Sequence, residues 1–530
     1  MECSMSDISL TARAAVVRLP LKIILVILVL GLLAASGCAV KPVPFSDQER
    51  LTQMHKDKAA LYEGQEPLDH PLSLAEAIAR ALKYNYDHRL AMMESVLQDK
   101  QLDLSTLDML PRLVATAGYH GRSNEQASNS ISYETRKETL EASVSQEPHR
   151  FTGDLTLTWN ILDFGVSYYQ AKQQADRYLI ALEQRRKVMN QIAGEAVLLY
   201  YRAVTAEKML PRLEEILASA QDALDAYDTI EKEQLEPLLP VLEQKRALLK
   251  LIAHLKGLKS DLMLAKSQLA ALVSLPLYTP YAMDGSGDET TLPEIQTSIE
   301  DLESLGLMNR PDMREHSYKE RIGRHDVTKE LLRLLPGIEL SGSLMYDSNK
   351  YFVNNFWAEA GAVITANIFD LVKGPKRIGI AETQVEINKV RRLALAMAAV
   401  VQINISYRKY MQAVEAYDSA TQVNDVEQRI LDIVSEAVLL EAESPLERVQ
   451  RQTSAILAEM EREWALAEAF RSLGDLYFST GTDMFSGLPE TLELSTLTAQ
   501  VQKSLDGFYS GEFPAVPEMV EDEIQLQGNE

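Results

Sequence analysis

Cysteine, clustered histidine and nucleotide-binding glycine motifs are scarce or absent in this 530-residue chain. The eight histidines are scattered, and none stands in a His-Glu-x-x-His or similar metal-ligand spacing. Gly285-Ser286-Gly287 lacks the lysine of a phosphate-binding loop, and no Gly-x-Ser-x-Gly nucleophile motif occurs. Asp163 and Asp370 are expected to begin helices, where a carboxylate accepts hydrogen bonds from free backbone N–H groups. We therefore expect no enzyme activity, no cofactor and no metal site.

Positive charge is also in short supply. The chain has 53 Lys and Arg residues against 77 Asp and Glu residues, which gives a formal net charge of −24. Nucleic-acid binding needs clustered Lys and Arg side chains that neutralise phosphates. The charge balance therefore argues against nucleic acid as a partner.

Long apolar runs are missing except near the N-terminus. A positively charged segment contains Arg13, Arg18 and Lys22. The apolar segment Leu21–Leu33 is shorter than a typical transmembrane helix. Small residues follow up to Gly37, and Cys38 comes next. This order predicts a bacterial lipoprotein signal peptide over residues 1–37, with Cys38 acylated as the new N-terminus.

Two points qualify this signal. The large residue usual three positions before the cysteine is replaced by Ala35, and the alternative is an ordinary signal peptide with an incidental cysteine. Ala39 and Val40 follow Cys38, without the Asp that would retain a lipoprotein at the inner membrane. We expect the mature chain to be lipid-anchored at the cell outer membrane. It has no disulfide, since Cys3 leaves with the signal and Cys38 carries lipid.

Internal repetition dominates the rest of the sequence. Several short motifs recur with an offset of 225 residues in the early part of each half and of 207 or 208 residues later. The matched pairs are Asp87 with Asp312, Pro111 with Pro336, Asp163 with Asp370, Tyr200 with Tyr407, and Pro237 with Pro445. A duplication with an insertion between Gly121 and Arg150 explains the change of offset. We predict a first repeat over residues 72–275 and a second over 299–476.

Each repeat presents the same order of elements. A helix (Leu74–Leu107 or Ile299–Leu334) ends at a Leu-Pro step, because proline cannot continue a helix. Two strands follow, and then two very long helices. Beyond Phe485 the chain becomes rich in Gly, Pro and acid, and we expect it to be mobile.

The strands alternate apolar and polar residues with period two, which indicates a sheet with unlike faces. The apolar positions are Phe151, Leu155, Leu157 and Trp159, then Ile338, Leu340 and Leu344, then alternate residues from Ala358 to Ile368. Such strands suit a membrane β-barrel. The alternative is a half-buried sheet in a soluble protein.

The long helices carry apolar residues at steps of three and four, for example from Leu248 to Leu272, as in packed coiled coils. A helix from Asp163 to about Leu235 would be roughly 100 Å long, and Pro211 predicts a bend in it. Four strands cannot close a membrane barrel, since open edges in lipid leave backbone groups unsatisfied. Copies of the chain must therefore share strands, most simply in a cyclic assembly.

This arrangement resembles the TolC and OprM-like outer membrane efflux family, also called outer membrane factors. The resemblance runs from about Leu72 to Leu476. It is carried by the order and spacing of four motifs: Leu72-Ser73-Leu74-Ala75-Glu76-Ala77-Ile78, Leu110-Pro111, Leu157-Thr158-Trp159-Asn160-Ile161-Leu162-Asp163-Phe164-Gly165, and Ser444-Pro445-Leu446-Glu447.

The resemblance implies a mainly α fold with membrane β: a homotrimer whose twelve strands form one β-barrel in outer membrane lipids, continued by a periplasmic α-helical barrel. An equatorial region would gather residues 38–71, the connection 276–298 and the C-terminal segment 477–530. Family members export drugs, metal ions or proteins together with a periplasmic adaptor (membrane fusion) protein and an inner-membrane pump.

The sequence departs from the family where the helical hairpins turn. A glycine is usual there, but the nearest equivalents are Glu233 and Glu441, and Glu236 and Glu443 lie close by. Our hypothesis is that these acids surround a periplasmic mouth and favour cations or a basic adaptor tip. The alternative is a solvated acidic turn.

The sequence thus predicts a passive exit duct of a tripartite efflux or type I secretion system. The alternative, from another class, is a lipid-anchored periplasmic coiled-coil scaffold without transport activity. A scaffold gives no reason for a polar face opposite an apolar one in the strands.

Overall fold

The computed structural model describes residues 42–138, 141–234, 237–276, 279–284, 291–438, 445–483 and 493–517. The chain divides into two compact units, of which the first ends at Glu63. In this first unit, helix α2 (Asp47–Ala60) begins with a capping box, because Ser46 and Glu49 each accept a hydrogen bond from the other's backbone N–H. The second unit starts at Gly64 and contains all other described helices and strands.

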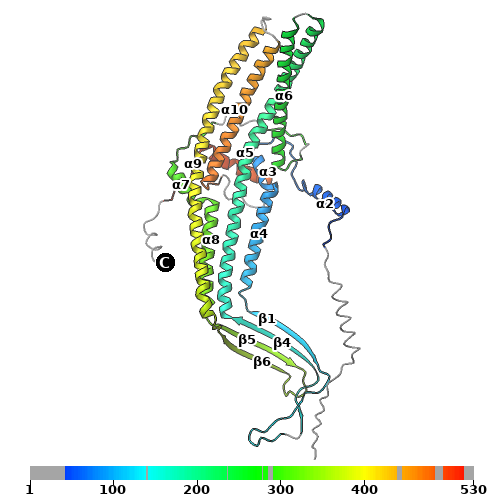
Figure 1. The fold of residues 1–530 in the computed structure, drawn as a ribbon, viewed down its shortest axis with the longest axis vertical. Helices are drawn as coiled ribbons and strands as arrows, with labels where there is room; N and C mark the ends of the chain where they lie inside the picture. Colours follow the sequence, from blue (N-terminus) through cyan, green and yellow to red (C-terminus); the bar gives the residue numbers. More distant parts are fainter. Residues whose placement is uncertain are drawn as a thin grey trace, which may run out of the picture. The chain divides into compact units, whose positions relative to one another are not determined.

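The second unit repeats one series of elements twice (Figure 1). The first series is α3 (Leu74–Tyr84), α4 (Tyr86–Leu107), β1 (Arg112–Gly121), β4 (His149–Asn160), α5 (Ile161–Glu233) and α6 (Leu238–Leu272). The second series is α7 (Ile299–Asn309), α8 (Pro311–Leu332), β5 (Gly337–Asp347), β6 (Phe356–Thr365), α9 (Asp370–Val438) and α10 (Pro445–Ser479). The helix lengths agree pairwise: 11 residues for α3 and α7, 22 for α4 and α8, and 35 for α6 and α10. This agreement supports a duplication.

The first helix of each repeat is broken, contrary to the single helices predicted over Leu74–Leu107 and Ile299–Leu334. Asn85 has an extended backbone and its side chain accepts hydrogen bonds from the N–H groups of Asp87 and His88, so it begins α4 as an N-cap. Arg310 is also extended, and Pro311 is the first residue of α8, where its missing N–H costs nothing. A side-chain cap at Asn85 and a proline at position 311 therefore divide each predicted helix into two.

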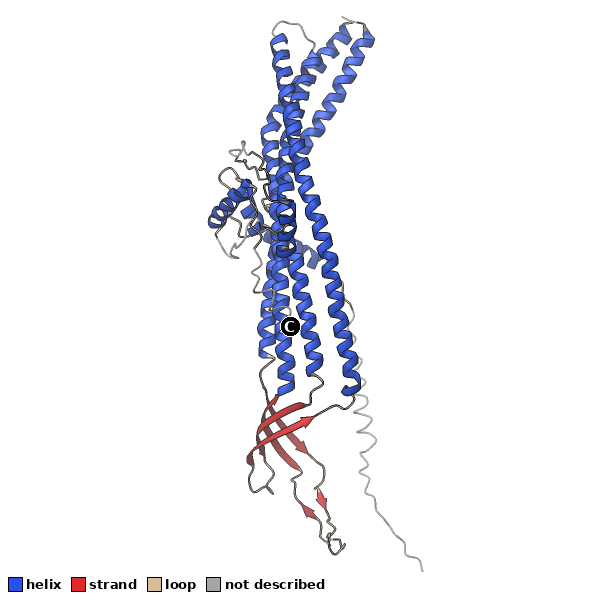
Figure 2. Cartoon of the chain, turned by 90° about the vertical axis from the view of Figure 1, so that its left-hand side faces the viewer, coloured by secondary structure: helices blue, strands red, loops and turns tan. Residues whose placement is uncertain are grey.

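The four long strands form one antiparallel sheet in the order β1-β4-β5-β6 (Figure 1). Figure 2 shows this sheet, in red, at one end of the long helices. The last strand ends at Thr365, whereas we predicted its alternation to continue to Ile368; residues 368 and 369 form a turn instead. The insertion between β1 and β4 contains a further pair of short strands, β2 (Ala127–Ser128) and β3 (Ser143–Val144).

The helices next to the sheet follow the order of the strands. α4 packs on α5, α5 on α8, and α8 on α9. Farther from the sheet α6 packs on α5, α5 on α10, and α10 on α9. α5 and α9 run through both parts, with 73 and 69 residues. Helix α5 continues through Pro211 without interruption, and the bend at this proline stays a prediction.

The main core lies where α3 and α11 (Leu494–Ser510) pack beside the middle of α5 and the end of α10. Fully buried residues from these helices include Ile78, Ala196, Phe470 and Val501. The mobile segment predicted beyond Phe485 is therefore wrong for residues 493–517, because the apolar face of α11 is buried against α3. The acidic residues from Glu518 onward lie outside the described residues.

Candidate functional site

The sheet has one apolar and one polar face, and a single chain covers neither. Directly paired residues share a face: Leu155 pairs with Ala115 and Leu344, whereas Thr156 pairs with Val114 and Ser343. The register places the apolar positions predicted in β4, β5 and β6 on one face. Their large side chains are exposed, and Ile364 is 71 % exposed. Within one chain, this sheet buries no core of its own.

The two outer strands, β1 and β6, each have one partner in the sheet. Among the described residues, their outward edges pair with no other strand. Such edges present rows of unpaired N–H and C=O groups and readily accept another strand. The sheet is therefore open at both ends of its strand order.

The helical layer next to the sheet is open in the same way. Its outermost helices are α4 and α9. Each carries a row of exposed apolar side chains in which successive residues are three, four or seven positions apart. On α4 these are Tyr86, Leu90, Met93, Leu97, Leu104 and Leu107, and on α9 they are Ile380, Ile387, Val390, Met397, Val401 and Ile405. This spacing is typical of a coiled-coil seam that lacks its partner.

In the half of the helical layer that is farther from the sheet, the outermost helices are α6 and α9. On α6 the exposed side chains of Leu239, Leu242, Leu249 and Met263 share one stripe with the exposed Arg246 and Lys256. On α9 Val426 and Ile433, seven residues apart, continue the exposed edge. Both halves of the helical layer thus end in apolar edges.

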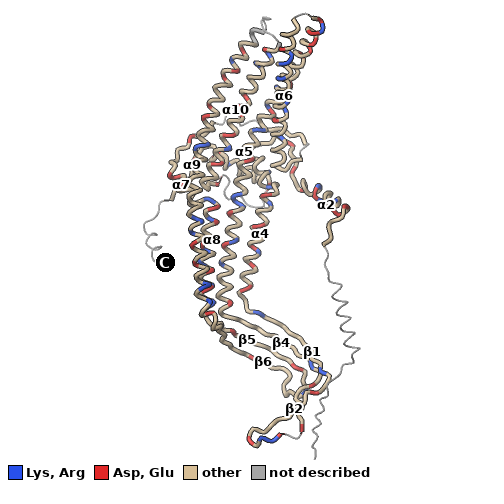
Figure 3. The backbone as a smooth tube through the Cα atoms, viewed as in Figure 1, with Lys and Arg blue, Asp and Glu red and all other residues tan. Residues whose placement is uncertain are grey.

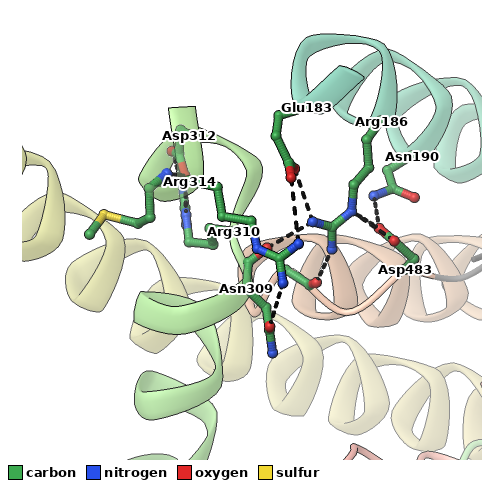
Figure 4. Close-up of polar contacts among 10 residues, drawn as sticks. Glu183, Arg186, Asn190, Asn309, Arg310, Asp312, Arg314 and Asp483 are labelled. Carbon is green, nitrogen blue, oxygen red and sulfur yellow. Dashed lines mark hydrogen bonds and ion pairs between the residues drawn. The ribbon is translucent and has the colours of Figure 1, made fainter. Parts of the chain in front are cut away.

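A polar cluster joins the two repeats at the break between α7 and α8 (Figure 4). The guanidinium group of Arg186 on α5 donates to both carboxylate oxygens of Asp483, at 2.6 and 2.7 Å, and to the backbone oxygen of Asn309 at 2.9 Å. Asn190 donates to Asp483 as well, at 2.9 Å. One arginine therefore connects α5, the end of α7 and the segment after α10.

Arg310 and Asp312 extend this cluster on the other side of the break. The Arg310 guanidinium donates to both oxygens of Asp312, at 2.9 and 2.7 Å, and to the backbone oxygen of Ser479 at 3.2 Å. Burial alone would raise the pKa of Asp312, but the hydrogen bonds and charge of Arg310 hold this pKa below its usual value. Asp312 is therefore ionised at neutral pH.

A second buried ion pair fixes α3. Arg80 is 1 % exposed, and its guanidinium donates to Oε1 of Glu76 at 2.8 Å and to the backbone oxygens of Glu66 and Pro67. His70 contacts the other oxygen of Glu76 at 2.8 Å. Because each group has several partners, the pair holds the segment before α3 in place. We did not predict this network, although the Glu76/Arg80 spacing of four residues on one helix is a signal for it.

The predicted acidic residues of the periplasmic mouth are described only in part. Glu233 is exposed at the end of α5, and it has no ion pair among the described residues. The left-handed residue that closes this helix is Gln234, with φ of 55°. Lys245 neutralises two nearby acids, Asp228 and Glu231, at 2.5 and 2.7 Å. Glu236, Glu441 and Glu443 lie outside the described residues, as does Cys38.

Within the described ranges, no group of three or more His, Cys, Asp or Glu side chains could hold a metal ion. In the same ranges, no helix is both long and apolar enough to cross a membrane. Charged residues lie along all the long helices (Figure 3).

Comparison with known proteins finds likeness in structure alone: no family model and no curated protein matches the sequence. The structure is similar to the Campylobacter jejuni CmeC outer membrane channel, with a TM-score of 0.61 and 16% identity over 89% of this chain and 97% of CmeC. It is also similar to the open state of the Neisseria gonorrhoeae MtrE outer membrane channel, with a TM-score of 0.58 and 17% identity over 77% and 88% of the two chains.

The outer membrane protein VceC from Vibrio cholerae matches with a TM-score of 0.57 and 14% identity, over 77% of this chain and 96% of VceC. CusC and OprN match with similar scores. At sequence identities this low, the structural similarity shows a shared fold and nothing further. The resemblance predicted from the sequence is therefore confirmed in structure: this chain has the mainly helical fold of the TolC and OprM-like outer membrane channels.

Proposed function

We propose that this protein is the outer-membrane channel of a tripartite efflux or type I secretion system. Three copies form a passive exit duct across the periplasm and the outer membrane. Their twelve strands close one β-barrel, and their long helices continue it as an α-helical barrel. The acylated Cys38 anchors each copy to the membrane. The duct is not an enzyme, and the energy for export comes from an inner-membrane pump through a periplasmic adaptor.

One observation carries this proposal: the sheet and the helical layer have the same order and are open at the same sides. β1 and β6 end the sheet, while α4 and α9, which adjoin these strands in sequence, end the helical layer. A second copy can therefore pair β1 with β6 and pack α4 on α9 at once. Repetition around an axis covers every open edge, as a membrane barrel requires.

The two faces of the sheet give this ring its direction. The apolar face suits lipid, and the polar face, which includes Thr156 and Ser343 joined by a 3.0 Å hydrogen bond, suits a water-filled lumen. The exposed Glu233 lies at the opposite end of α5 from the sheet, where we place the periplasmic mouth. The acids predicted there, Glu233, Glu236, Glu441 and Glu443, would favour cations or a basic adaptor tip.

The test is to purify the acylated protein in detergent, measure its mass, and insert it into planar lipid bilayers. We expect a detergent-stable trimer, resistant to trypsin, with stepwise ion conductance. The competing outcome is a monomer that, as Cys38→Ser, is extracted without detergent and conducts nothing. That outcome would favour a lipid-anchored coiled-coil scaffold without transport activity.

A further inference from the structure

The junction between β6 and α9 exposes an unusual combination of large apolar side chains and unpaired cations. Ile368, Phe369, Leu371 and Val372 are between 69 and 77 % exposed. Lys373 and Lys376 follow within the first two turns of α9, and both are exposed. Neither lysine has an ion pair among the described residues, unlike Arg377 close by, which pairs with Asp370 at 3.1 Å.

The position of Lys373 is electrostatically unfavourable within the chain itself. Lys373 ends the first turn of α9, where the positive end of the helix dipole repels cations, and Lys376 adds a second cation one turn later. The chain as a whole is strongly acidic, so two unpaired lysines at this place are not explained by the general charge. An anion outside the chain would relieve the repulsion.

Packing of the helix determines which side chains point away from the protein. A Cβ atom on Gly374 would lie 2.0 Å from Cδ2 of Leu334, so Gly374 faces the turn that directly follows α8. Successive residues of a helix are rotated by about 100°. Val372 and Lys376, each two residues from Gly374, therefore lie on the opposite side, away from α8. Lys373 and Lys376 are neighbours at a spacing of three residues.

The corresponding junction of the first repeat has a different character. At the offset of 207 residues, Lys373 and Lys376 correspond to Val166 and Tyr169. Asp163 is exposed there, and the nearby Tyr168 and Tyr169 lie against Lys172, with Nζ 4.7 and 5.5 Å from their ring centres. The unpaired cations thus belong to the second repeat, and a function shared by both junctions does not explain them.

We propose that the β6–α9 junction binds the headgroups of anionic phospholipids, with Lys373 and Lys376 contacting the phosphate and Phe369 and Val372 entering the acyl region. This proposal rests on the proposed function, which places the end of the sheet at the membrane surface. Lysine side chains there extend toward headgroups while the neighbouring apolar side chains stay in hydrocarbon. Each lysine near an anionic surface strengthens binding about fivefold.

The test is to titrate the detergent-purified full chain with phosphatidylglycerol and, separately, with phosphatidylcholine, and to count bound lipids by native mass spectrometry. We expect Lys373→Gln/Lys376→Gln to weaken phosphatidylglycerol binding roughly thirtyfold at low salt, with phosphatidylcholine binding unchanged. The matched control is Lys187→Gln/Lys409→Gln, which removes two exposed lysines far from the sheet.

Equal phosphatidylglycerol binding by the double variant and the wild type would overturn the proposal, as would an equal loss in the control. Dissociation of the assembly without a change in lipid binding would assign the junction to contacts between copies instead. Conductance of the wild type in planar bilayers is measured in parallel. If the protein conducts ions but does not prefer phosphatidylglycerol, the lipid-binding inference is wrong and the channel function stands. If it prefers phosphatidylglycerol but does not conduct, the channel function is wrong and the lipid-binding inference stands.

Discussion

The middle of the helical layer and its edges differ in how far a single chain buries their apolar side chains. In the middle, α5 and α10 bury residues such as Leu213 and Phe470 completely, and Arg186 on α5 has several hydrogen-bond partners. At the edges, α4 and α9 leave large apolar side chains in solvent, with Met397 68 % exposed. Apolar patches of this extent mark surfaces that another molecule covers. One chain therefore folds its own interior, and its edges are suited to copies of itself.

The comparison predicts the largest loss of stability where the interior is broken. Arg80→Met leaves the buried carboxylate of Glu76 without its main partner, and we expect a loss of about 3–5 kcal/mol in the free energy of unfolding. Lys83→Met on the same helix is the control. Its pair with Glu66, at 2.7 Å, is half-exposed, so the expected loss is about 0–1 kcal/mol. Thermal unfolding of both variants checks the difference, and equal losses would contradict the distinction between interior and surface.

An edge substitution is expected to act on assembly and leave the fold intact. Met397→Asp places a carboxylate in the proposed seam between copies, at a cost of about 1–3 kcal/mol or more per contact. We expect trimers to dissociate while the helix content stays the same, as measured by native mass and circular dichroism. Gln170→Asp on α5, also exposed, adds the same charge in the middle of the layer and should not affect assembly. Similar behaviour of the two variants would count against α9 as a contact between copies.

Acid is expected to loosen the polar cluster that links the two repeats. The pKa of Asp312 lies below its usual value, so its contribution to stability is present above about pH 4 and is lost as pH falls through the folded value. The stability lost in Asp312→Asn should therefore shrink on acidification.

Asp475 on α10 provides a control of opposite sign. The Asp475 side chain is exposed, but the protein around it partly desolvates the carboxyl and raises its pKa, so its contribution is small, is present at low pH and is lost as pH rises through the folded value. Asp475→Asn should therefore become stabilising relative to the wild type as pH rises. Unfolding curves measured across pH for both variants test this. If the stability difference from the wild type changed with pH in the same direction for both, the two carboxyl groups would not have distinct environments.

The smallest effect is expected at the periplasmic mouth. Glu233 is exposed, so Glu233→Gln should change stability by less than about 0.5 kcal/mol. Glu441→Gln removes the corresponding charge of the second repeat. If these acids act on cations or on an adaptor, cation selectivity in bilayers or adaptor affinity should fall. Lys245→Gln serves as a comparison, since it frees Asp228 and Glu231 and should shift selectivity in the opposite direction. Unchanged selectivity and affinity in both Glu variants would reject the hypothesis for the mouth.

The sequence was informative where periodicity extends over many residues. The repeat, the four strands and the long helices follow from such patterns, and α5 was predicted within two residues of both ends. The breaks at Asn85 and Arg310 were missed, because each depends on one residue: the side chain of Asn85 caps α4, and Pro311 begins α8. Helix α11 was missed as well. Its apolar stripe is short, it precedes an acidic segment, and its packing against α3 is not visible in the local sequence.

The candidate site could be predicted only in outline. Alternation indicated the two faces of the sheet, but no local pattern shows which helices are outermost. That depends on contacts between α5 and α8, which are far apart in the sequence. The cluster around Arg186 is equally nonlocal, since Asp483 is 297 residues away.

The most direct test of the shared edges is a disulfide between α4 and α9. Leu97 lies ten residues before the end of α4 and Ile380 ten residues after the start of α9, so each lies about 15 Å from the end of its helix nearest the sheet. Within one chain α5 and α8 separate them by roughly 25 Å, too far for a disulfide. We predict that oxidised Leu97→Cys/Ile380→Cys runs as covalent dimers and trimers, while each single variant does not. A double variant that stays monomeric, with Leu90→Cys/Ile387→Cys behaving likewise, would contradict the assembly.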